Sequence, residues 1–236
     1  MASPDKGMVS FLSRMMPIGS GRAKPRRSGS REHPSAERRR EERMLFAKNF
    51  LEHPRMLGSL IPSSRFLVNR VLKHVDFERA RTIVEYGPGV GTFTARILER
   101  MHPQARLVVF ELNGDFVAYL LRALPDRRLY VVHGSAETVH RELKRRTIPG
   151  ADYIISGIPY TTLPARLRET IMRESRAALN PGGAVLVYQF TRSVLPYLRT
   201  HFRHIHQDFE PRNILPARLF YCTQEKGEYL IPARSD

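Results

Sequence analysis

The sequence predicts an α/β fold in which a mostly parallel sheet of seven strands carries helices on both faces, with a helical extension before it. Short apolar runs alternate with helical stretches along residues 60–223, and a glycine turn joins the first run to the helix after it. Hydrophobic residues make up 42% of the chain, enough for a large core. Cys222 is the only cysteine, which excludes a disulfide scaffold and suits a reducing compartment such as the cytoplasm.

Ahead of the fold the chain divides into two basic segments. Residues 1–35 are expected to form a disordered basic arm, because residues 19–35 are mostly Gly, Ser, Pro and Arg. Residues 36–62 are expected to hold an amphipathic helix that packs on the core or lies at a membrane interface. Its apolar side includes Phe46 and Phe50, beside the basic residues Arg39, Arg40 and Arg43. The main domain is expected over residues 63–236.

The elements of the domain follow in order. A helix is expected over residues 64–75, after the start signal Pro62-Ser63-Ser64. Further helices are expected over residues 92–101 and 163–179, and a turn over 180–183. The expected strands are residues 81–86, 107–110, 129–133, 152–156, 184–190, 205–209 and 218–223.

Charge narrows the possible partners. Lys and Arg exceed Asp and Glu by 16, with a net +6 in residues 1–43 and +10 in the remainder. Such a surplus points to an anionic partner, either nucleic acid or an anionic lipid surface. Because no apolar stretch approaches the ~20 residues of a membrane span, any membrane contact is expected to be peripheral.

The first strand ends in a nucleotide-binding pattern. Glu85 is followed by Gly87, Gly89 and Gly91, whose backbone can turn sharply and approach a ligand closely. The second strand ends in Glu111, an acid suited to accept ribose hydroxyls. A dinucleotide fingerprint requires glycine at the first, third and sixth places, but Thr92 stands at the sixth.

Glu-x-Gly-x-Gly-x-Gly instead resembles the first motif of class I S-adenosylmethionine-dependent methyltransferases, which have a Rossmann-like fold. The resemblance implies that S-adenosylmethionine is the cofactor and that Glu85 lies near its methionine amino group. Ser135 stands where the family usually has an Asp against adenine, so there the Ala136 backbone is the firmer candidate. The cofactor-binding residues implied by the resemblance are Glu85, Tyr86, Gly87, Gly89, Gly91, Glu111, Leu112, Ser135, Ala136 and Ser156.

The segment after the fourth strand indicates which class of molecule accepts the methyl group. Adenine methyltransferases have Asn-x-Pro-aromatic there, and this chain keeps Pro159 and Tyr160 but has Gly157 at the Asn position. A glycine cannot supply the amide hydrogen bond to the base. An RNA or DNA adenine methyltransferase therefore stays an alternative, and nucleic acid the less favoured partner.

Several short motifs resemble bacterial phospholipid N-methyltransferases, which methylate phosphatidylethanolamine toward phosphatidylcholine. These are Pro62-Ser63-Ser64, Ser156-Gly157-x-Pro159 and Leu215-Pro216-Ala217-Arg218, together with the basic amphipathic helix. Enzymes that methylate ornithine lipids are a close alternative. The resemblance implies an enzyme held peripherally on the inner face of the cytoplasmic membrane.

Aromatic residues are the candidates for contact with the headgroup. Tyr160 is the predicted catalytic residue, with its hydroxyl as a hydrogen-bond acceptor and its ring as a cation–π surface for the ammonium. Tyr188, at the end of the fifth strand, is expected to extend that wall. No metal is expected, because no carboxylate or Cys spacing accompanies the histidines at 201, 204 and 206.

Overall fold

The structure is a computed structural model that describes residues 63–213 and 215–224. The predictions for residues 1–35 and 36–62, including the roles of Arg39, Arg40, Arg43, Phe46 and Phe50, lie outside the described residues.

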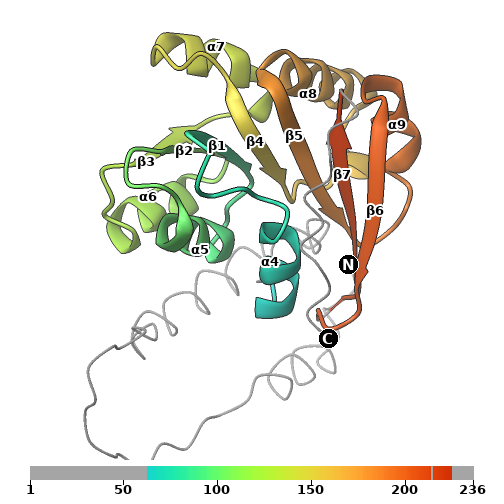
Figure 1. Ribbon diagram of the computed structural model, residues 1–236, viewed down its shortest axis with the longest axis horizontal. Helices are drawn as coiled ribbons and strands as arrows, with labels where there is room; N and C mark the ends of the chain where they lie inside the picture. The colour runs from blue at the N-terminus through green and yellow to red at the C-terminus, as the bar shows by residue number, and fades with distance from the viewer. Residues whose placement is uncertain (1–62, 214, 225–236) are drawn as a thin grey trace, which may run out of the picture. The chain divides into compact units, whose positions relative to one another are not determined.

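Seven strands form one sheet in the order β3-β2-β1-β4-β5-β7-β6 (Figure 1). All neighbouring pairs are parallel except β5 with β7 and β7 with β6. The parallel strands have their carboxyl ends at one edge, where ligands bind in open α/β sheets. The strands are β1 (Thr82–Tyr86), β2 (Arg106–Glu111), β3 (Leu129–His133), β4 (Ala151–Ser156), β5 (Leu179–Gln189), β6 (His204–Glu210) and β7 (Ala217–Thr223).

Helices cover both faces of this sheet (Figure 1). On one face, Ile83 and Leu107 pack against side chains of α4, α5 and α6. On the other face, Val84 and Val108 pack against α7, α8 and α9. Because side chains alternate along a strand, each inner strand contributes to both layers. The helices are α4 (Arg65–Leu72), α5 (Thr92–Arg100), α6 (Gly114–Ala123), α7 (Val139–Arg145), α8 (Ala165–Ala177) and α9 (Leu195–His201), with the short 3-10 turns η2 (Ala136–Thr138) and η3 (Tyr160–Thr162). The predicted seven-stranded, mostly parallel sheet is confirmed.

The structure differs from the sequence prediction at the start of β5 and at two helices. β5 begins at Leu179, the last residue of the expected helix, and includes residues 180–183, which were expected to form a turn; its register against β4 is irregular between Ala151 and Tyr153. Gly182, with φ 74°, accommodates that irregularity. In addition, α6 and α9 were not anticipated, although Asn113 caps α6 by accepting hydrogen bonds from the backbone of Asp115 and Phe116.

Helix α4 is fixed to the far edge of the sheet. Arg70 donates to Glu210 at 2.8 Å and to Asp208 at 3.1 Å, and both acids lie on β6. Ser64 caps the helix by accepting from the backbone N–H of Leu67 at 3.2 Å. These contacts hold the start of α4 beside the carboxyl edge. Among the described helices, none has the length and apolar character needed to cross a bilayer.

Candidate active site

The glycine turn after β1 leaves open space on one side. Gly89 has φ 55°, and a Cβ placed there would meet no atom within 4 Å. Gly91 also has a positive φ, 76°, but a Cβ there would lie 2.7 Å from Leu120 of α6. Gly91 is therefore needed for close packing of two helices, whereas Gly89 faces a space that a ligand can occupy.

Glu111 closes that turn from the end of β2. One carboxylate oxygen accepts from the N–H of Gly89 at 3.1 Å and the other from the N–H of Asn113 at 2.9 Å. Burial raises the pKa of Glu111, and these backbone hydrogen bonds oppose the rise. The ribose-binding role that the sequence motif implies for Glu111 stays a prediction.

Glu85 lies deeper, on the same face of the sheet. It is buried and accepts a 2.7 Å hydrogen bond from the hydroxyl of Thr94 on α5. Burial raises the pKa of Glu85 to about 8, and the negative charge of Glu111 adds to the rise. An ionised carboxylate has more lone pairs than one hydroxyl satisfies, so a cationic amine would be stabilised beside it.

The acceptor side lies where β1, β4 and β5 end next to one another. The register pairs Tyr86 with Ser156 and Ser156 with Val187, which brings Gly157 beside Tyr188. A Cβ at Gly157 would overlap the hydroxyl and Cζ of Tyr188 and lie 2.9 Å from its Cε2. The phenol of Tyr188 thus fills the space that a side chain at 157 would need.

Several contacts hold Tyr188 in that place. Its ring stacks on Phe93 of α5, with centroids 4.9 Å apart and planes 18° apart. Ser63 hydrogen-bonds to its hydroxyl. Burial and the negative charge of Glu85 raise the pKa of Tyr188. Gln189 donates to the carbonyls of Ile158 and Tyr188, both at 2.8 Å, and so ties the loop after β4 to β5.

Two of the short sequence motifs are linked to each other through Asn213. The N–H of Ser64 donates to the Asn213 side chain at 2.8 Å, and Asn213 in turn donates to the carbonyl of Leu215 at 2.9 Å. Ser64, at the start of α4, and Leu215, shortly before β7, are therefore joined through Asn213.

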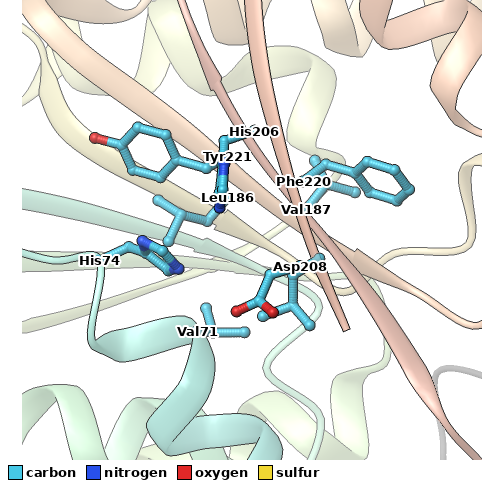
Figure 2. A pocket seen from close by; sticks show the side chains of 9 residues that line it. Val71, His74, Leu186, Val187, His206, Asp208, Phe220 and Tyr221 are labelled. Atoms are coloured by element: carbon cyan, nitrogen blue, oxygen red, sulfur yellow. The ribbon is translucent and has the colours of Figure 1, made fainter. Parts of the chain in front are cut away.

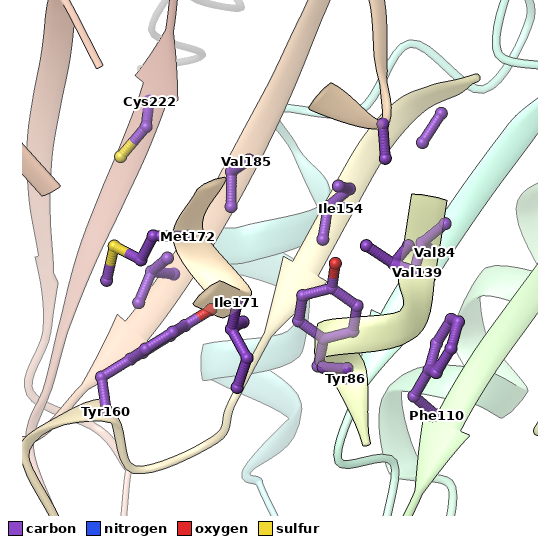
Figure 3. Close-up of a cluster of buried hydrophobic side chains, with 14 of the residues drawn as sticks. Val84, Tyr86, Phe110, Val139, Ile154, Tyr160, Ile171, Met172, Val185 and Cys222 are labelled. Carbon is purple, nitrogen blue, oxygen red and sulfur yellow. The ribbon is translucent and has the colours of Figure 1, made fainter. Parts of the chain in front are cut away.

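Tyr160 does not have the position predicted for it. Its ring is 1% exposed and lies in the core beside Ile171 and Met172 of α8 (Figure 3). Its hydroxyl accepts from Ser156 at 3.0 Å. The structure contradicts the expectation of a ring open to an ammonium ion, because η3 turns the side chain toward the α8 layer.

Two predicted cofactor residues have side chains in that same core. Tyr86 is fully buried, and its hydroxyl lies 3.0 Å from that of Ser175 on α8 (Figure 3 shows the ring of Tyr86). Ser156 is buried, with its hydroxyl bound to Tyr160. Any contact of these two residues with the cofactor would therefore be made by the backbone at the strand ends, and it stays a prediction.

The predicted adenine side is formed by the ends of β2 and β3. Leu112 follows Glu111 and is 66% exposed, and its carbonyl lies 3.1 Å from a ring nitrogen of His133. The Ser135 hydroxyl accepts from the backbone of Glu137, which fixes it as a cap of η2, and Ala136 is buried. Contacts of Leu112, Ser135 and Ala136 with adenine stay predictions.

A separate pocket lies between α4 and the β5–β7–β6 end of the sheet. His74, His206 and Tyr221 line one side of it, and Val71 and Asp208 lie toward α4 (Figure 2). The rings of His74 and His206 are 6.1 Å apart. In the described part of the chain, no group of three or more His, Cys, Asp or Glu side chains is arranged to hold a metal ion.

Phe93, Thr94, Gln189 and Asn213 belong to the site but were not identified from the sequence. Phe93 and Thr94 lie in the first turn of α5, directly after the glycine turn, and this proximity was the available signal. Asn213 gave no signal, because its contact partner Ser64 lies 149 residues away in the sequence.

The open glycine turn and the two acidic residues at adjacent strand ends define a class I S-adenosylmethionine-dependent methyltransferase. Comparison with known proteins agrees. The chain belongs to the ribosomal RNA adenine dimethylase family, whose model matches residues 52–180. It is 32% identical over 189 residues to the ornithine lipid N-methyltransferase of Singulisphaera acidiphila, covering 78% of this chain and 97% of that protein.

Solved structures share the fold at low sequence identity. The N-methyltransferase NodS from Bradyrhizobium japonicum aligns with a TM-score of 0.56 at 13% identity, over 68% of this chain and 96% of that one. Human methyltransferase-like protein 13 in complex with SAH aligns with a TM-score of 0.52 at 16% identity, over 77% and 85% of the two chains.

Proposed function

We propose that the protein transfers methyl groups from S-adenosylmethionine to the primary amine of a membrane aminolipid, with ornithine lipid as the first candidate and phosphatidylethanolamine as the second. The observation that carries the proposal is which side chain occupies the space beside Gly157. The amide that adenine methyltransferases use there is absent, and Tyr188 fills its space. Similarity over nearly the full length of an ornithine lipid N-methyltransferase favours ornithine lipid over phosphatidylethanolamine.

The residues of the chain fit the cofactor. Gly89 faces open space, Glu111 lies at the end of β2 for the ribose, and Glu85 is placed to accept the amino group. When bound, S-adenosylmethionine supplies an electrophilic methyl group on a positively charged sulfur. The chain's own contribution is to orient the acceptor amine and to keep water away from it.

A primary amine attacks only when it is unprotonated, so the site must favour its neutral form. Tyr188 is partly buried and its pKa is raised, which keeps its hydroxyl neutral at physiological pH. A neutral hydroxyl accepts a hydrogen bond from an amine N–H without stabilising a positive charge as a carboxylate would. Tyr188 therefore orients the amine and does not act as its base.

The basic character of the chain supports a second part of the proposal. With a net charge of +16, the enzyme would be held peripherally at the inner, anionic face of the cytoplasmic membrane. Residues 36–62, with Arg39, Arg40, Arg43, Phe46 and Phe50, are the proposed membrane-contacting segment. The aminolipid and the anionic surface are then the enzyme's partners.

Adenine N6-methylation of RNA is the second candidate function, because the family model is that of ribosomal RNA adenine dimethylases. One experiment separates the candidates. Purified protein is incubated with methyl-labelled S-adenosylmethionine and with vesicles that contain ornithine lipid or phosphatidylethanolamine, vesicles of phosphatidylcholine alone, or small-subunit ribosomal RNA. Label in the ornithine lipid is expected. Label in RNA and in neither lipid would refute the lipid proposal.

A further inference from the structure

The backbone conformation at position 157 does not by itself require a glycine. Gly157 is not among the described residues with positive φ, so its conformation is open to any L-amino acid. What excludes a larger residue is contact, because a Cβ would overlap the Tyr188 hydroxyl and Cζ. Residues 157 and 188 are therefore sterically coupled, because a side chain at position 157 and the Tyr188 phenol in its present place would occupy the same space.

Tyr188 cannot easily move aside to relieve such an overlap. Its ring is stacked on Phe93, its hydroxyl is bonded to Ser63, and its backbone carbonyl accepts from Gln189. Leu186, two residues earlier on β5, fixes the same face of the strand in the core. Any added atom at 157 must therefore break stacking or hydrogen bonding of the tyrosine.

The phenol also lies on the catalytic face of the sheet. Glu85 lies close enough for its charge to raise the pKa of Tyr188, and Gly157 directly follows the strand next to β1. A hydroxyl in that position can accept a hydrogen bond from an aliphatic amine through its single oxygen. It lacks the two separate atoms, one donor and one acceptor, that an Asn amide offers to the edge of a base.

We propose that Gly157 and Tyr188 form a matched pair that selects the acceptor, with the Tyr188 hydroxyl contacting an aliphatic primary amine in the space where adenine enzymes place an Asn side chain. This inference rests on the proposed function and names the residue that would receive its substrate. It also makes a steric statement that holds whatever the substrate is.

The steric part is tested by thermal unfolding of Gly157→Ala, Tyr188→Ala and the double variant. A methyl group added against a held ring strains the packing, so Gly157→Ala is expected to lower the Tm by about 5 °C. In the Tyr188→Ala background, the same change is expected to lower the Tm by less than about 1 °C. Equal effects of Gly157→Ala in both backgrounds would overturn the pairing.

The chemical part is tested by Tyr188→Phe, which keeps the ring and its stacking on Phe93. SAH affinity by calorimetry is expected to stay within about twofold, while kcat/KM for ornithine lipid in vesicles falls about tenfold through loss of one hydrogen bond. Tyr130→Phe is the matched control, because Tyr130 is an exposed residue of β3, at the other end of the sheet. An unchanged kcat/KM in Tyr188→Phe would overturn the amine contact.

The two tests also separate this inference from the proposed function. If the wild-type protein labels RNA and no aminolipid, the proposed function and the amine contact both fail, and the Tm cycle alone decides the steric pairing. If the wild-type protein labels aminolipid and Tyr188→Phe does so equally well, the proposed function stands and the role of Tyr188 is refuted.

Discussion

Glu85 makes cofactor binding depend on pH in a predictable direction. Burial raises its pKa to about 8, so about one carboxyl in eleven is ionised at pH 7 in the unliganded protein. A cationic amino group beside Glu85 favours the ionised form, and binding must therefore release nearly one proton. The ionised fraction rises about thirtyfold from pH 5.5 to pH 7, a range in which an α-amino group stays charged. We expect SAH affinity to rise by about the same factor.

Calorimetry in two buffers of different ionisation enthalpy measures both quantities. In the wild-type protein, the apparent binding enthalpies in the two buffers should differ by nearly the full difference between the ionisation enthalpies of the buffers, as expected for close to one proton released. In Glu85→Gln, the proton release should disappear and the affinity should become nearly constant below pH 7. Glu111, whose pKa burial also raises, is unchanged in that variant and acts as the internal comparison. Proton release retained in Glu85→Gln would refute the assignment of Glu85 as the partner of the amino group.

Three further predictions follow from the same site and from the N-terminal segment. On folding, the pKa of the Glu85 carboxyl rises from 4.5 to about 8. The free energy of unfolding of the protein therefore falls as the pH increases through that range, by up to ~5 kcal/mol above pH 8. In calorimetric unfolding, unliganded Glu85→Gln should melt several degrees above wild type at pH 8 and close to it at pH 4.5. Equal Tm values at pH 8 would contradict this. Glu111→Ala removes the acceptor for the Gly89 N–H and the proposed ribose contact, and it should weaken SAH binding at least about 100-fold by calorimetry, an unchanged affinity being the opposing result. Deletion of residues 1–51 should abolish sedimentation with anionic vesicles while SAH affinity is retained, whereas continued sedimentation would mean that the surface of the domain suffices.

The sheet could be predicted because its signal is local. Strands such as β1 and β2 are buried on both faces, so they read as continuous apolar runs, and the glycine turn marks the change to helix. Glu85 and Glu111, the acids of the candidate cofactor site, could be placed in the fold for the same reason, since they lie at or next to the ends of these runs. The irregular start of β5 could not, because it depends on pairing with β4 across a gap that no local pattern records.

Proximity in the sequence favoured Tyr160 as the residue that contacts the acceptor, but the structure buries its side chain. Tyr160 lies in the motif after β4, but η3 turns its ring toward α8, away from the face that holds Glu85. Tyr188 lies 31 residues beyond Gly157 and reaches it only because β4 and β5 pair in parallel, with Ser156 opposite Val187. Alternation along β5 then sends its side chain to the α5 face, together with Leu186. A motif at one strand end is thus completed by the neighbouring strand. The same reasoning applies wherever this fold lacks a side chain of the motif after β4. A replacement should then be sought first at the paired position of the adjacent strand, and only afterwards within the motif.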